Sequence, residues 1–272
     1  MIAILMSVYK NDQVSQLARS IISITTQQTL KPDYLCIVVD GQVNKELSFY
    51  LENLEIKDIN LSVIWLERNV GLSNALNEGI KFLKKIGGIK YLVRMDADDI
   101  SSPDRLRLQV DYMNNNGEIA VSSAQVYIFD DNIENLIGKR VLPSNRLTEF
   151  SKRKTPINHS CSIFLFRVFD DISYPNTRLP FEDWWISLRI LKEGWKIGVL
   201  DEYLMFFRGG QEMLARRAGL NYLIKEVTFF FKIYDEGLMS LHTTMTNIFI
   251  RSIVRVLPKK IFFYLYKKRF HR

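Results

Sequence analysis

Three carboxylates within four residues, Asp96, Asp98 and Asp99, form the most distinctive cluster in the chain of 272 residues. Carboxylates this close together repel one another, and burying them is costly unless a cation lies among them. Hard oxygen ligands suit Mn²⁺ or Mg²⁺, which proteins usually hold through one or two carboxylates together with substrate phosphates. The alternative is a solvated acidic turn before a helix. Because the cluster directly follows the apolar run Tyr91–Met95, we favour the metal site.

A second pattern places two acids before two tryptophans, at Glu182, Asp183, Trp184 and Trp185. A positioned carboxylate can act as a general base and remove the proton of an attacking hydroxyl group. The alternative is that the acids complement a helix dipole while the tryptophans fill the core. We favour the catalytic interpretation because the chain also carries the acidic cluster at 96–99.

The elements that must position these groups alternate regularly through the first half of the chain. Apolar runs predict buried strands, and apolar residues spaced three or four apart predict helices. We expect strands over Ile2–Ser7, Tyr34–Val39, Leu61–Leu66 and Tyr91–Met95, separated by helices over Val14–Gln28, Lys45–Leu54 and Ser73–Lys85. Asp12 is a candidate cap for the first of these helices.

This alternation predicts an α/β fold with a mostly parallel central sheet that is flanked by helices. In such sheets, ligands bind beyond the carboxyl ends of the strands. Polar clusters fall at those ends, over Ser7–Asn11, Asp40–Gly41, Glu67–Gly71 and Asp96–Asp99. We therefore expect a site along one edge of the sheet.

The second half of the chain is less regular. We expect helices over Pro103–Asn115 and Phe181–Glu193, strands over Ala120–Phe129, Cys161–Arg167 and Trp195–Leu200, and a loop-rich excursion over Asp130–Pro156. After Gln211 the pattern is helical, with a break at Pro258. The chain thus divides into a body over 1–210 and a helical C-terminal region over 211–272.

The composition is that of a packed globular protein, with 47% apolar and 25% charged residues. Cys36 and Cys161 each lie in an apolar run, which predicts buried free thiols and suits a reducing cytoplasm. The N-terminal apolar run lacks the features of a signal peptide. No stretch reaches the roughly 18 apolar residues that a spanning helix needs.

The net charge of +7 is concentrated at the C-terminus, where residues 237–272 contain eight Lys or Arg and no Asp or Glu. An amphipathic, cationic and aromatic segment at Ile248–Tyr266 fits the surface of an anionic bilayer. The alternatives are a helix that packs back on the body and a nucleic-acid-binding tail. The aromatic density favours the membrane.

Several motifs in a fixed order resemble those of the family 2 glycosyltransferases, especially the members that build bacterial surface polysaccharides. The resemblance covers roughly the first two-thirds of the chain. It rests on Met6–Asn11, Val38–Gly41, Arg68–Asn77, Val93–Ile100, Ser102–Leu106, Asn158-His159 and Phe181–Trp185. It implies the GT-A fold, a Rossmann-like arrangement with a nucleotide-sugar site, here with a helical C-terminal appendage.

The resemblance also implies a donor site. Asp40 would bind the base of the nucleotide, and Ser7, Val8 and Tyr9 would line its pocket. Asp96 and Asp98 match the DxD motif of the family, so Asp98 would bind Mn²⁺ or Mg²⁺ directly and Asp96 would contact the ribose or a metal-bound water. Further donor-site candidates are Arg68, Asn69, Asn77, Arg94, Ala97 and Arg208. Many members carry two consecutive Asp residues where this chain has Asp40 followed by Gly41.

For the acceptor, the resemblance makes Asp183 the general base of an inverting transfer. Glu182, Trp184 and Trp185 would lie on the acceptor side, with the tryptophans shielding the site or stacking on a sugar ring. His159 is a further candidate for that side, although a lone histidine is more often a packed or capping residue.

Together with these features, the resemblance implies an inverting transferase that moves a hexose or N-acetylhexosamine from a UDP-sugar to a saccharide linked to undecaprenyl diphosphate. It would act in O-antigen or other surface-polysaccharide synthesis at the cytoplasmic face of the membrane, without nucleic acid. A nucleotidyltransferase acting on sugar phosphates is the alternative, but its usual Gly-rich phosphate loop is missing from Ser7–Asn11. A non-catalytic membrane-binding module is a third hypothesis.

Overall fold

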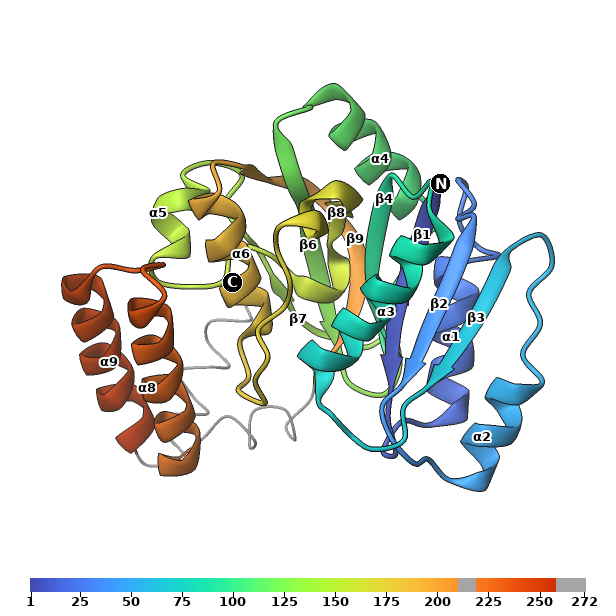
Figure 1. The fold of residues 1–272 in the computed structure, drawn as a ribbon, viewed down its shortest axis with the longest axis horizontal. Helices are drawn as coiled ribbons and strands as arrows, with labels where there is room; N and C mark the ends of the chain where they lie inside the picture. Colours follow the sequence, from blue (N-terminus) through green and yellow to red (C-terminus); the bar gives the residue numbers. More distant parts are fainter. Residues whose placement is uncertain (210–218, 258–272) are drawn as a thin grey trace.

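A computed structural model describes residues 1–209 and 219–257, and one nine-stranded sheet runs through it (Figure 1). The first four strands are mutually parallel: β1 (Ile2–Val8), β2 (Tyr34–Val39), β3 (Asn60–Trp65) and β4 (Tyr91–Asp96). The crossovers between them contain α1 (Val14–Ile24), α2 (Lys45–Glu52) and α3 (Leu72–Ile86). The predicted alternation is confirmed, and β2 has the predicted bounds.

The second half adds strands that make the sheet mixed rather than mostly parallel. It contains β5 (Ile100–Ser101), β6 (Ile119–Phe129), β7 (Leu136–Arg140), β8 (Ile163–Leu165) and β9 (Lys196–Arg208). Strand β8 lies antiparallel between β4 and β6, whereas β6 and β9 are parallel. The α/β prediction holds, but the parallel arrangement stops at β4 because the chain reverses direction to insert β8.

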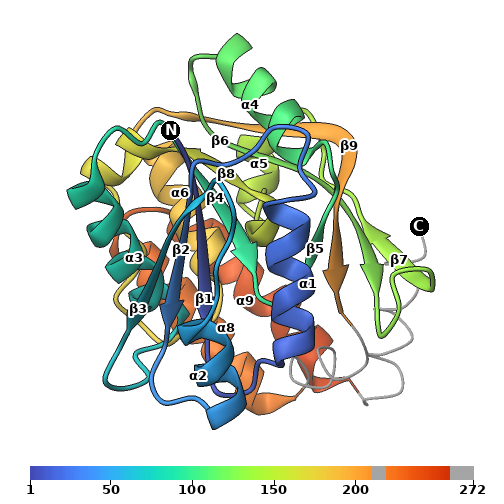
Figure 2. The same cartoon turned by 90° about the vertical axis from the view of Figure 1, so that its right-hand side faces the viewer.

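The helices divide between the two faces of the sheet (Figure 2). Apolar residues of α1, α2 and α4 (Arg105–Asn115) form the core on one face, and those of α3 and α6 (Glu182–Lys192) form the core on the other. Cys36 and Cys161 are buried free thiols, as predicted.

Three local predictions are corrected by the structure. The excursion over 130–156 contains β7 and the short helix α5 (Leu147–Ser151). The predicted strand over 161–167 is shortened to β8 by the 3₁₀ turns η1 (His159–Cys161) and η2 (Phe166–Asp170). Asp12 does not cap α1, because Gln13 occupies the cap position and the Asp12 carboxylate accepts the backbone N–H of Tyr9 at 2.8 Å.

Helices α8 (Leu220–Asp235) and α9 (Leu241–Val256) pack side by side at the end of the described chain (Figure 1). The Glu226 carboxylate, only 1% exposed, pairs with Arg251 at 2.5 Å and with Arg255 at 2.8 Å. Two of the eight basic residues of 237–272 therefore bind within the protein, as the packing alternative predicts. The other six, and the predicted break at Pro258, lie outside the described residues.

The outer faces of these helices carry apolar side chains. Phe249 is 67% exposed and Ile253 53%, and Leu241 and Met245 continue the same stripe along α9. On α8, Leu220 and Ile224 are also exposed. Over the part of the chain that the structure describes, no helix combines the length and apolar character needed to cross a membrane.

Candidate active site

The acidic cluster lies at the carboxyl end of β4, where the sequence places it. Asp96 is the last residue of the strand, and its side chain is 34% exposed and pairs with the guanidinium of Arg94. Arg94 is almost fully buried and also donates to the Met95 carbonyl. Arg94, a predicted donor-site residue, is thus an ion-pair partner of Asp96.

Burial and mutual repulsion perturb the carboxyl groups around Asp96. Burial raises the pKa of Asp98 to about 6, and the charge of Asp96 adds to the rise. Burial also raises the pKa of Asp12 to about 7, with further contributions from Asp98 and Asp96. These carboxyl groups hold protons unusually tightly mainly because they are buried, and the crowded negative charge, which a divalent cation would relieve, adds to the effect.

The third carboxyl group, Asp99, has a structural role. It is fully buried, and burial raises its pKa well above the usual range, with Asp98 adding to the effect. It accepts the backbone N–H of Arg208 at 2.8 Å. The Arg208 side chain in turn donates to the Asp98 carbonyl (3.2 Å) and the Asp130 carbonyl (2.6 Å). Asp99 therefore joins the end of β9 to the acidic cluster and brings Arg208 beside Asp98.

Asp40 organises the ends of β2 and β3. Its carboxylate accepts the backbone N–H groups of Val70 (2.6 Å) and Gly71 (3.0 Å). The side-chain amide of Asn69 donates to it at 2.9 Å. Asp40 thus fixes the loop that leads into α3, a role that the sequence motif does not reveal. Gly41 is required beside it, because its φ is +85° and a Cβ atom there would overlap the Asn69 backbone.

An open hollow lies in front of this loop. It is lined by Tyr9, Lys10, Asp40, Gln42, Glu67, Arg68 and Asn69. The structure therefore brings together the predicted donor-site residues Tyr9, Asp40, Arg68 and Asn69 at the carboxyl ends of β1, β2 and β3.

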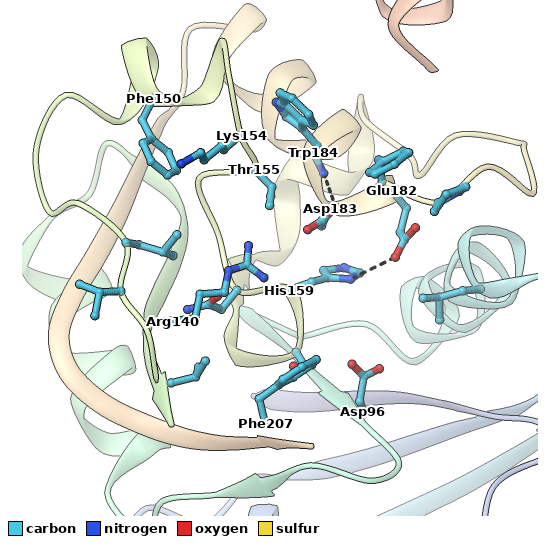
Figure 3. Close-up of a pocket in the computed structure, with 18 of the residues that line it drawn as sticks. Asp96, Arg140, Phe150, Lys154, Thr155, His159, Glu182, Asp183, Trp184 and Phe207 are labelled. Atoms are coloured by element: carbon cyan, nitrogen blue, oxygen red, sulfur yellow. Dashed lines mark hydrogen bonds and ion pairs between the residues drawn. The ribbon is translucent and has the colours of Figure 1, made fainter. Parts of the chain in front are cut away.

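A deeper pocket of about 410 Å³ contains the second predicted motif (Figure 3). Glu182 and Asp183 begin α6 and face the pocket, with Asp96 on its opposite side (Figure 3). One Asp183 oxygen accepts the backbone N–H of Trp184 at 2.8 Å. The carboxyl end of β4 and the start of α6, far apart in sequence, thus border the same space.

The turn before α6 holds an unusual backbone conformation. Phe181 has a φ of +88°, in the left-handed region that non-glycine residues rarely occupy. Its ring packs on Phe229 of α8, with ring centres 4.9 Å apart. The strain is therefore stabilised by aromatic packing, and it fixes the direction in which the following acids enter the pocket.

A buried network supports the acids. His159 Nε2 lies 2.8 Å from the Tyr174 hydroxyl, and His159 Nδ1 lies 3.8 Å from a Glu182 oxygen. Burial lowers the pKa of His159 well below its usual value, so the ring is neutral at neutral pH and the contact is not an ion pair. Burial raises the pKa of Glu182 to about 7, and the charge of Asp183 adds to the rise.

The remaining predicted residues are placed as follows. Trp184 borders the pocket but is buried, and its indole N–H donates to the Ser151 carbonyl at 2.6 Å. Trp185 lies outside the pocket lining, with its indole N–H bound to Glu236 at 2.8 Å. Trp185 therefore fills the core, as the alternative interpretation predicts, because successive helical residues point in different directions.

Four donor-site candidates are also placed away from the two lined spaces. Val8 and Ala97 lie in the core, so their side chains do not face a ligand. Ser7 is half-buried within β1, in register with Asp96 of β4. The Asn77 side chain makes paired hydrogen bonds with the backbone of Tyr174, at 2.9 and 3.0 Å. Asn77 thus positions the chain segment that carries the partner of His159.

Sequence reasoning missed several residues that border the site. Asp12, which the sequence suggests as a helix cap, interacts electrostatically with Asp98 and Asp96. Arg140 and Lys154 line the pocket from the excursion that the sequence presents as a loop. Tyr222 and Arg251 line it from the C-terminal helices. The polar cluster after β1 is a signal for Asp12, whereas nothing local marks the others.

Within the described ranges, no three His, Cys, Asp or Glu side chains form a group that could hold a metal ion by themselves. A site of one or two carboxylates completed by substrate phosphates remains compatible with Asp96 and Asp98.

The fold and the site define an α/β enzyme with an acidic cluster at the sheet edge, a polar hollow beside it and a carboxylate-lined pocket. Residues 3–173 match glycosyl transferase family 2. The chain belongs to this family and is a glycosyltransferase. The matched region includes Asp40, Asp96 and Asp98 and ends before Asp183.

Relatives cover nearly the whole chain. It is 32% identical to the amylovoran biosynthesis glycosyltransferase AmsE of Erwinia amylovora, over 98% of either chain. It is 30% identical to the UDP-Gal:alpha-D-GlcNAc-diphosphoundecaprenol beta-1,3-galactosyltransferase of Escherichia coli, over 99% of this chain and 96% of the relative.

Among solved structures, residues 1–349 of S. aureus TarS in complex with UDP-GlcNAc match with a TM-score of 0.60. That match has 16% sequence identity and covers 85% of this chain and 66% of the TarS chain. At this identity, the likeness shows the fold alone, and it agrees with the predicted GT-A arrangement.

Proposed function

We propose that this glycosyltransferase is an inverting enzyme that moves a hexose or N-acetylhexosamine from a UDP-sugar to a saccharide linked to undecaprenyl diphosphate. The reaction would serve the synthesis of a bacterial surface polysaccharide. The observation that carries the proposal is that Asp96 and Asp183 face one pocket from opposite sides. The relatives named for amylovoran synthesis and for a diphosphoundecaprenol acceptor support the substrate class.

The donor would lie along the sheet edge. The hollow lined by Tyr9, Asp40 and Arg68 would take the base and ribose, which leads the diphosphate toward Asp96 and Asp98. A relative in fold binds UDP-GlcNAc, which supports a UDP-sugar. Since one lone pair of the Asp40 carboxylate remains after its three hydrogen bonds, Asp40 can still accept a bond from the base.

Mn²⁺ or Mg²⁺ would be held by Asp98 and Asp96, with Asp12 nearby. The residues fit such an ion, because the pKa values of Asp98 and Asp12 are raised by burial and by crowded negative charge. When bound, the ion would neutralise charge on the diphosphate of the donor. Arg208, fixed beside Asp98, would add positive charge on the same side.

Asp183 would be the general base. It would remove the proton of the acceptor hydroxyl as the oxygen attacks the anomeric carbon, on the face opposite the departing UDP. The neighbouring Glu182, with a pKa raised to about 7, would be partly protonated and would add less negative charge to the site. This arrangement yields inversion in one displacement.

The C-terminal region would hold the enzyme on the cytoplasmic side of an anionic membrane, where lipid-linked acceptors reside. The exposed apolar stripe of α9, which includes Phe249 and Ile253, would enter the bilayer interface. The six basic residues of 258–272 would bind anionic lipid head groups.

Family membership favours sugar transfer over the nucleotidyltransferase alternative.

The test is release of UDP from a panel of nucleotide-sugars with Mn²⁺, measured for matched pairs of variants. Asp98→Ala should abolish turnover, whereas Asp111→Ala, an exposed acid on α4, should not change it. Asp183→Asn should lower the rate of transfer by at least about 100-fold, the scale of general-base catalysis. Its control is Glu193→Gln at the other end of α6. Full activity of both site variants would contradict the mechanism.

A further inference from the structure

The pocket that contains Asp183 is electrically polarised. Glu182 and Asp183, and Asp96 across from them, lie toward the right of the pocket in Figure 3, whereas Arg140 and Lys154 lie toward the left. Arg251 and Arg255 of α9 also line it, together with Glu226. With Lys139, the described lining contains five Lys or Arg residues and four Asp or Glu residues, and Glu226 is the carboxylate that pairs with Arg251 and Arg255.

Four of these cations, Arg140, Lys154, Arg251 and Arg255, come from three parts of the chain and are held in place. Arg140 is on β7 and donates to the Ile157 carbonyl at 3.2 Å. Arg251 donates to the Arg153 carbonyl at 3.0 Å, and its guanidinium lies over the Trp184 ring at 5.0 Å. Lys154 lies over the Phe150 ring at 5.7 Å. Tertiary packing thus brings these cations together, and no single stretch of the sequence indicates that they form a cluster.

We infer that this cationic wall, made of Arg140, Lys154, Arg251 and Arg255, binds the diphosphate that links the acceptor sugar to its lipid. The inference rests on the proposed function, because it needs a sugar whose hydroxyl reaches Asp183. A diphosphate esterified at both ends carries two negative charges, which the wall can neutralise. Guanidinium groups suit phosphate oxygens because they donate paired hydrogen bonds in a fixed geometry.

The direction of the lipid follows from the helix that carries the two arginines. Arg251 and Arg255 face the pocket, while Phe249 and Ile253, each two residues away, are exposed on the outer side of α9. The lipid chain attached to the acceptor diphosphate would therefore extend along α9 and contact its apolar outer side. The same helix would bind the charged and the apolar parts of one acceptor.

The wall is separate from the donor's diphosphate site. The donor phosphates are expected near Asp96, Asp98 and Arg208; of these only Asp96 lines this pocket, and it lies away from Arg140 and Lys154 (Figure 3). A test of the wall can therefore be made with the donor site saturated.

The experiment compares three acceptors that carry the same sugar and the same alkyl chain, joined through a diphosphate, a monophosphate or an ether oxygen. With wild-type protein, UDP-sugar and Mn²⁺, kcat/KM should be highest for the diphosphate and at least about 100-fold lower for the ether. Arg140→Ala and Lys154→Ala should each reduce this preference about tenfold, equivalent to ~1.4 kcal/mol, because kcat/KM falls further for the diphosphate acceptor than for the ether acceptor. Arg251 and Arg255 are left intact because they neutralise buried Glu226.

Lys152→Ala is the matched control, since Lys152 lies two residues from Lys154, pairs with Glu149 at the surface and is outside the pocket lining. Thermal shifts with an alkyl diphosphate and with inorganic pyrophosphate, both at saturating UDP, separate a lipid-linked ligand from a free anion. Stabilisation by the alkyl diphosphate that is lost in Arg140→Ala supports the inference.

Three outcomes would overturn it: a wild-type enzyme with no preference for the diphosphate, an undiminished preference in both variants, or binding of inorganic pyrophosphate alone. An undiminished preference would leave the proposed function intact. A wild-type enzyme that releases no UDP from any nucleotide-sugar, with any acceptor, would instead refute the proposed function.

Discussion

Replacing Glu226 by alanine tests whether the C-terminal helices are an integral part of the pocket. The Glu226 carboxylate is 1% exposed and is shared by Arg251 and Arg255, whose side chains are 22% and 7% exposed. Removing one partner of a buried ion pair costs about 3–5 kcal/mol, because a charge remains buried without compensation. For a domain of this size, that corresponds to a decrease in Tm of about 10 °C.

The assay is thermal unfolding of wild type and variant, combined with hydrogen exchange of the α9 backbone. Exchange should become faster in α8 and α9 first, since these helices carry the broken contacts. The control is Glu78→Ala, which removes an exposed ion pair with Lys81 at 3.7 Å and should change stability by less than about 1 kcal/mol. A Glu226→Ala protein that melts within about 2 °C of wild type would refute the assigned role of this carboxylate.

Two further predictions concern Glu182 and Gly79. Because the pKa of Glu182 is raised to about 7 in the folded state, its protonated form stabilises the fold below the unfolded pKa near 4.5, and this contribution is lost as pH rises through 7. Glu182→Gln should therefore flatten the fall in Tm between pH 5 and pH 8, and an unchanged pH profile would contradict the pKa shift. Gly79→Ala should destabilise the protein by about 1–3 kcal/mol in denaturant unfolding, because the new Cβ would overlap Leu5 and press on Val38. Gly117→Ala, which meets no atom within 4 Å, is its control, and equal stability of the two variants would show that α3 can move away from β1.

The sequence predicts best the features that depend on local pattern. Strand β2 is uniformly apolar, and its predicted bounds equal the observed ones. The acidic cluster could be placed at the sheet edge because it follows an apolar run, and parallel strands end on a common side. Strand β7, by contrast, is mostly exposed and short, so its residues do not alternate strongly enough to distinguish it from a loop.

The site residues that sequence reasoning missed are those whose role depends on distant partners. In the sequence, Arg251 belongs to a run of basic residues, whereas in the structure it forms an ion pair with Glu226 of another helix. Asn77 lies within a family motif, yet its amide binds the backbone of Tyr174, 97 residues away. The Asp40 carboxylate is likewise bound by a loop about 30 residues later. A pattern shows which residue types are present, whereas the fold decides which partners they meet.

The configuration of the new glycosidic bond is the most direct measure of the proposed mechanism. With an α-linked UDP-sugar and the alkyl diphosphate acceptor, the anomeric proton of the product can be followed by NMR during the first turnovers. If Asp183 activates the acceptor hydroxyl for a single displacement, the product is β-linked and Asp183→Asn forms it at least about 100-fold more slowly. An α-linked product, or undiminished formation of the β-linked product by Asp183→Asn, would contradict this account.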